Sequence, residues 1–187
     1  MTVPPVRPWT AVSARGLGLV IMLVLGWQVA ARGITSAAPG FLLAILDGAN
    51  FVFHEGGHIL FLFLGQFIHA LGGSLTQVAI PIACAIHFWR HRQPAAAAAA
   101  LFWAGESVTQ VAIYVADGRA MSLPLHGGPG VIHDWNYLLT RMGLVEWSVG
   151  LGRAAFALGL ALVAGALGLL GLDLLRVLTS EEAAGPS

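Results

Sequence analysis

Five long apolar segments divide this chain, and they constrain its fold more than any other feature. They cover residues 16–31, 41–71, 73–89, 95–116 and 154–172. A helix of about 20 apolar residues crosses the roughly 30 Å hydrocarbon core of a bilayer. Because lipid offers no hydrogen-bonding partner to the backbone, apolar spans of this length form helices. The sequence therefore predicts an all-α, polytopic membrane helix bundle with four to five spanning segments.

The charge content supports the same conclusion. Only 10% of the residues are charged and 57% are hydrophobic, whereas soluble domains carry about 25% charge. Nine basic residues, all arginine, balance nine acids, so no basic surface is available for nucleic acid. We expect one integral, multi-pass domain over 1–187 in a lipid bilayer. Its polar ends are residues 1–15 and 177–187.

Three of the segments allow alternatives. As one helix, residues 41–71 would extend about 46 Å, beyond the hydrocarbon core. This segment is expected to tilt, protrude or break. The expected interruptions are Asp47-Gly48 and Gly72-Gly73, and Gly56-Gly57 lies between them inside the motif described below. Residues 73–89 contain Pro81, which predicts a kinked or partly re-entrant helix. Residues 16–31 follow arginines and precede small residues, so a cleaved signal peptide is the alternative to a first span.

The sequence His54-Glu55-Gly56-Gly57-His58 lies inside the second apolar segment. On a helix, two histidines four residues apart share one face and can hold one Zn²⁺, while the glutamate can act as general base on a bound water. Ionisable residues at bilayer depth cost about 2.5 to 3.5 kcal/mol each. Three of them within five residues favour a metal site with Glu55 as the catalytic base. A polar patch that joins helices without metal is the alternative.

Catalytic zinc sites commonly use three protein ligands, so another segment must supply the third. On a continuous helix His69 would lie about 16 Å beyond His58, which excludes it. Asp117 is the first candidate, because it shares a helix face with Glu106 and Gln110. That polar face should point into the bundle. His133 and Asp134 are the second source, in a loop predicted to carry a short helix near 135–141.

His87 and His91 form a second histidine pair with the same spacing. It keeps a membrane di-metal oxidoreductase open as an alternative, provided that both pairs come together. Because Arg90 and Arg92 are interleaved with it, an interfacial role is favoured. A metal-binding membrane protein without catalytic activity is the other alternative.

The segment from Phe53 to His58, with Asp117-Gly118 at the end of a later segment, resembles the site-2 protease-like membrane zinc metallopeptidases. The chain looks most similar to the small, compact bacterial-type members, which implies a bacterial-type cell membrane. The resemblance also implies an intramembrane zinc endopeptidase that hydrolyses a peptide bond of a membrane protein or membrane-associated peptide. It implies zinc held by His54, His58 and an aspartate, with Glu55 as general base. Members typically carry this aspartate in a Leu-Asp-Gly sequence, whereas Ala116 precedes Asp117 here.

Overall fold

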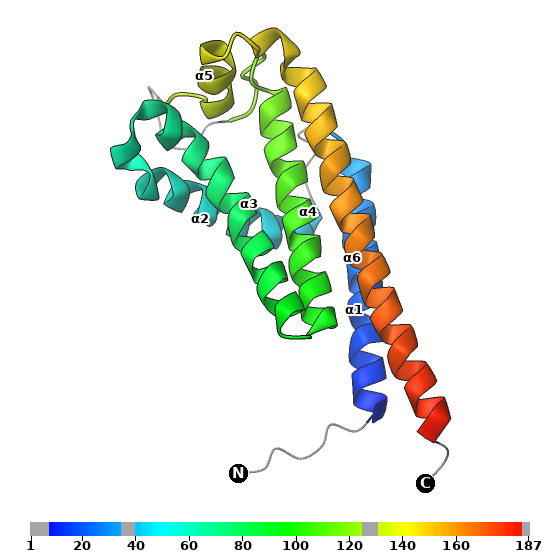
Figure 1. Cartoon of the computed structure of the whole chain (residues 1–187). Helices are drawn as coiled ribbons and strands as arrows, with labels where there is room; N and C mark the ends of the chain where they lie inside the picture. Colours follow the sequence, from blue (N-terminus) through cyan, green and yellow to red (C-terminus); the bar gives the residue numbers. More distant parts are fainter. Residues whose placement is uncertain (1–7, 35–39, 125–130, 185–187) are drawn as a thin grey trace.

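The computed structural model describes residues 8–34, 40–124 and 131–184. The described residues contain no β-strand, so the all-α prediction is confirmed. They form six α-helices and two short 3-10 helices, shown in Figure 1: α1 Pro8–Arg32, α2 Phe41–Leu60, η1 Leu62–Leu64, α3 Gln66–Arg90, α4 Pro94–Ala116, α5 Asp134–Arg141, η2 Val145–Trp147 and α6 Ser148–Ala184.

Four of these helices are long and apolar enough to cross a membrane. They are α1, α3, α4 and α6. In Figure 1, α1, α4 and α6 run side by side, and α3 descends from the upper left to meet the lower end of α4. Helix α2, which carries the His-Glu-Gly-Gly-His sequence, is not one of the four and lies across them at an angle. The described residues thus contain four helices that could span a membrane, which agrees with the lower end of the predicted range of four to five.

Several predicted boundaries shift. Helix α1 begins at Pro8 and α6 extends through Ala184, so both reach into the ends that the sequence marks as polar. Residues 1–7 and 185–187 lie outside the described ranges. Helix α3 continues through Pro81 from Gln66 to Arg90. The predicted short helix is present as α5.

Small residues bring α4 and α6 into close contact. A Cβ added at Gly159 would lie 2.8 Å from the carbonyl oxygen of Gly105. Larger residues at this crossing would push the two helices apart. The apolar core beside it draws on α1, α2, α4 and α6 and consists of Met22, Leu25, Val29, Leu43, Ala98, Phe102, Val163, Ala166 and Leu170.

The second apolar segment breaks where the sequence did not predict it. Helix α2 ends at Leu60, and the chain turns through Phe61–Gly65, where Gly65 adopts a φ of 84°. Glycine tolerates this left-handed backbone without steric cost. The interruptions predicted at Asp47-Gly48 and Gly72-Gly73 are wrong, because these residues are helical. Gly57 and Gly72 serve packing instead: a Cβ at Gly57 would overlap the carbonyl oxygen of Gly72, so α2 and α3 cross backbone to backbone.

A buried polar cluster joins α1, α2 and α4. Arg32 lies 3.1 Å from Asp47 and 3.2 Å from Glu106, and the amide of Asn50 donates to the other oxygen of Glu106. Glu106 and Asn50 are fully buried. The polar face of α4 therefore points into the bundle, as predicted, and Glu106 acts there as a contact between helices.

Candidate metal site

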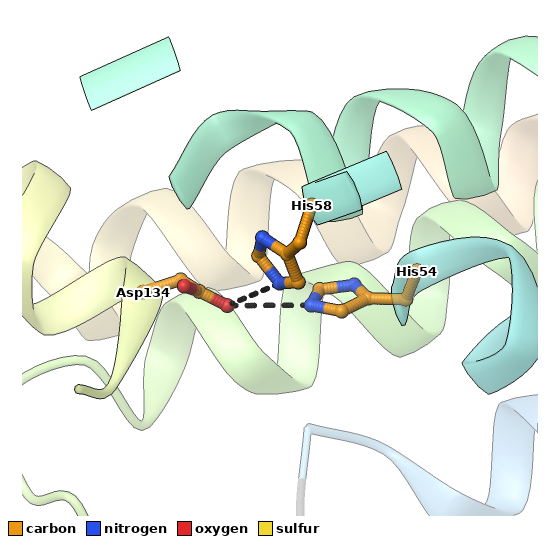
Figure 2. A group of neighbouring side chains, drawn as sticks. All are labelled: His54, His58 and Asp134. Atoms are coloured by element: carbon orange, nitrogen blue, oxygen red, sulfur yellow. Dashed lines mark hydrogen bonds and ion pairs between the residues drawn. The ribbon is translucent and has the colours of Figure 1, made fainter. Parts of the chain in front are cut away.

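Three potential metal ligands from two separated parts of the chain meet beside α2. His54 and His58 come from one face of α2, and Asp134 is the first residue of α5. Oδ2 of Asp134 lies 3.3 Å from Nε2 of His54 and 3.2 Å from Nε2 of His58, as Figure 2 shows. One ligand atom from each residue lies within 4.8 Å of the other two.

The second ring nitrogen of each histidine has its own partner. Nδ1 of His58 lies 2.8 Å from the backbone carbonyl oxygen of His69. A carbonyl oxygen only accepts, so this Nδ1 carries the proton and donates it. Nδ1 of His54 donates in the same way to the side-chain carbonyl oxygen of Gln77, at 3.1 Å. The amide of Gln77 in turn donates to Gln110, at 2.6 Å. Gln110 thus contacts the site through Gln77.

These hydrogen bonds determine the chemistry of the two Nε2 atoms. In a neutral imidazole whose Nδ1 is protonated, Nε2 carries a lone pair. Both lone pairs then point at the same carboxylate oxygen of Asp134, so three electron-rich atoms converge on one point. These three atoms repel one another unless positive charge lies between them, either as a metal ion or as extra protons on the two rings.

The distances fit a zinc ion. With bonds of 2.0–2.2 Å, two ligands of a tetrahedral zinc are separated by about 3.3 Å. The two distances to Asp134 match this separation. Burial raises the pKa of Asp134, but when the two rings carry the extra protons, their hydrogen bonds to Asp134 outweigh burial and lower the pKa to about 2. Asp134 is therefore a carboxylate at neutral pH, as a metal ligand must be.

Gly73 of α3 provides the space for the two imidazoles. A Cβ at this position would lie 2.6 Å from Nε2 of His54 and 2.7 Å from Nε2 of His58. Sequence reasoning treated this glycine as a helix interruption and missed its role. The only signal available was a glycine inside a helix, where it costs about 1 kcal/mol relative to alanine.

Glu55 lies beside the site and is open to its surroundings. Its side chain is exposed, and within the described parts of the chain it has no hydrogen-bond or ion-pair partner. The neighbouring Gly56 has open space where a Cβ would be. The Glu55 carboxylate is therefore available to contact a water molecule.

The structure places Asp117 and His133 together, away from the two histidines of α2. Nε2 of His133 donates to Asp117 at 3.1 Å, and Nδ1 accepts from the backbone of Asn136 at 3.2 Å. Burial raises the pKa of Asp117, but hydrogen bonds from Ser122, Leu123 and His133 lower it overall. Of the proposed third ligands, only Asp134 reaches His54 and His58. Asp117 and His133 instead fix the start of α5, which holds Asp134 in place.

The exclusion of His69 by distance is wrong, because it assumed a continuous helix. The turn at Phe61–Gly65 returns the chain, and the ring centroids of His58 and His69 are 5.1 Å apart. Nδ1 of His69 donates to the carbonyl oxygen of His58, at 2.9 Å. The two residues thus exchange hydrogen bonds and fix the orientation of the His58 ring.

The second histidine pair lies at the other end of α3. His87 is 14 residues beyond Gly73, which is about 21 Å along a helix. The rings of His87 and His91 stack on each other with centroids 4.2 Å apart. They do not join the site on α2.

Tyr114 is, like Gly73 and Gln77, a residue of the site region that the sequence did not predict. It lies on α4 near the helix end, and its hydroxyl contacts both the backbone N–H and the carboxylate of Asp134. A signal was present, because Tyr114 follows Gln110 by four residues on the polar face of α4.

No family model, curated protein or solved structure matches this chain. The geometry of the site therefore carries the functional conclusion.

Proposed function

We propose that this chain is an integral, multi-pass membrane zinc hydrolase that cleaves a peptide bond in a membrane protein or membrane-associated peptide. The observation that carries the proposal is the convergence of two imidazole lone pairs and one carboxylate oxygen. Zinc held by His54, His58 and Asp134 would supply a Lewis acid that makes water nucleophilic near neutral pH.

The residues of the chain divide the remaining work. Glu55, exposed and without a partner in the described structure, takes the proton of the attacking water and later gives it to the leaving amine. Gln77 and the His69 carbonyl hold the two imidazoles in the tautomer that presents Nε2. A helical substrate must unwind at the cleaved bond, because a hydrogen-bonded carbonyl is poorly accessible to attack.

Two features favour this function over the alternatives. A di-metal oxidoreductase needs the second histidine pair at the site, and His87 lies at the opposite end of α3. A structural zinc site is closed by four protein ligands, whereas only three residues of the described chain converge here. The free carboxylate of Glu55 beside this site suits hydrolysis. The resemblance of the motif to site-2 protease-like enzymes supports a peptide as the substrate.

Metal analysis of the purified protein tests the site. We expect one zinc per chain in the parent and in His91→Ala, which alters the remote pair. In His58→Ala and Asp134→Ala two ligands remain, so we expect a much weaker zinc affinity and less than one zinc per chain after purification. Two irons per chain, or one full zinc per chain in both site variants, would overturn the proposal.

Cleavage of a membrane-embedded reporter in proteoliposomes tests the reaction. Glu55→Gln should retain zinc and lose cleavage, because the amide cannot accept the proton. If Glu55→Gln cleaves as fast as the parent, Glu55 is not the base.

A further inference from the structure

The Tyr114 hydroxyl makes two contacts with the same residue. Its oxygen accepts from the backbone N–H of Asp134 at 3.1 Å, and it lies 3.3 Å from Oδ2 of that residue. The first N–H groups of a helix have no partner within the helix. The Tyr114 hydroxyl oxygen therefore accepts from a backbone N–H at the start of α5 that has no partner within the helix. The same hydroxyl group also contacts the Asp134 carboxylate.

We infer that Tyr114 is a positioning residue that selects the carboxylate oxygen of Asp134 presented to the two histidines. The inference rests on the proposed metal site and assigns a residue that the motif does not contain. Since the hydroxyl accepts from the backbone N–H, its own proton is free to point at Oδ2. Oδ2 is the oxygen that both Nε2 atoms approach.

The hydrogen bond has a defined consequence for the ligand. A carboxylate oxygen accepts more than one bond, so Oδ2 can hold the Tyr114 proton on one side and a cation on the other. The bond fixes the rotation of the carboxylate about its terminal torsion, which is otherwise broad. Partners of this kind orient metal ligands, and removing one typically costs 10–100-fold in metal affinity.

The ring of Tyr114 is itself held between two residues of the site region. It meets the His54 ring edge-on, with centroids 5.9 Å apart, and lies 4.3 Å from the ring of His133. A change to phenylalanine keeps these ring contacts and removes only the hydroxyl. Tyr114→Phe therefore isolates the hydrogen bonds to Asp134.

The experiment measures zinc affinity of the purified full chain by competition with a chromogenic chelator. We expect Tyr114→Phe to bind zinc about 10–100-fold more weakly than the parent. Tyr137→Phe is the matched control, because Tyr137 is the only other tyrosine of the chain and its ring and hydroxyl have no partner within the described residues. It should bind zinc as the parent does.

A double-mutant cycle separates positioning from a general loss of structure. If Tyr114 acts through Asp134, adding Tyr114→Phe to Asp134→Ala should weaken zinc binding no further. A full additional loss in the double variant would refute the inference, and so would parental affinity in Tyr114→Phe. Failure of the parent to bind zinc would instead overturn the proposed function, so the two failures are distinguishable.

Discussion

Replacing Gly73 by alanine tests whether the space beside the two imidazoles is required for metal binding. The added Cβ would lie 2.6 Å from Nε2 of His54 and 2.7 Å from Nε2 of His58, whereas ordinary contacts of a Cβ begin at 3.4 Å. The two nitrogens must therefore withdraw by about 0.7 to 0.8 Å. A zinc site tolerates ligand displacements of about 0.2 Å.

We expect Gly73→Ala to weaken zinc binding without destabilising the fold. Both rings can move away from a methyl group, and alanine in place of glycine favours a helix by about 1 kcal/mol. We expect zinc affinity to fall at least tenfold, in the range of about 10–100-fold seen for changes that misorient ligands. The unfolding temperature of the metal-free protein should stay close to that of the parent.

The assay pairs chelator competition with thermal unfolding in the absence of metal. Gly56→Ala is the matched control, because it lies within the motif and its Cβ would meet nothing within 4 Å. Its zinc affinity should equal that of the parent. Equal zinc affinities for Gly73→Ala and Gly56→Ala would refute the geometry of the site.

Three further predictions concern the scaffold. Arg32→Gln leaves two carboxylates without their charged partner in a buried cluster, so it should destabilise the fold by about 3–5 kcal/mol. Arg119→Gln is the control, because it breaks an ion pair in which both side chains are more than 60% exposed, and it should cost under about 1 kcal/mol. Thermal unfolding in detergent compares the two variants. Gly57→Ala should lower both the unfolding temperature and zinc binding, because its Cβ would overlap the carbonyl oxygen of Gly72 and separate α2 from α3; an unchanged unfolding temperature would count against the close crossing. Since hydrogen bonds lower the pKa of Asp117, its carboxylate stabilises the fold above its unfolded-state pKa of about 4, and this contribution is lost as the pH falls through the lower folded-state value. Asp117→Asn should therefore lower the unfolding temperature at neutral pH but not in strong acid, as a pH series of melting curves would show.

Much of the architecture follows from local sequence. Apolar length and helix geometry predict the four long helices, and the polar spacing on α4 places Glu106 and Gln110 inside the bundle. The spacing of His54 and His58 likewise puts both rings on one side of α2. These features depend on a single helix at a time.

The identity of the candidate third ligand depends on how the helices pack against one another. The spacing of residues along one helix does not determine that packing. Asp117 directly follows α4 and was expected on the same helix face as Glu106 and Gln110. Its carboxylate instead accepts hydrogen bonds from Ser122, Leu123 and His133. Asp134 reaches the site because α5 folds back and Trp135 donates to Ser74 of α3, at 3.0 Å.

The position of His69 also depends on how helices meet. It would lie far from His58 only on a continuous helix, whereas the chain turns at Gly65. A left-handed glycine is not distinguishable from a helical one in a sequence that contains 24 glycines.

The position of the site along α4 has a consequence for the supply of water. Tyr114 lies two residues before the end of α4, which is about 3 Å of helix, and Asp134 opens a helix that follows the connecting segment. A hydrolase buried at the centre of a bilayer needs a channel to bring in its second reactant. Under the proposed function, the reacting water would reach the site from this nearby end of α4, without a channel through the whole bundle. The greater energetic demand would then be to move an apolar peptide to the helix end where water is available.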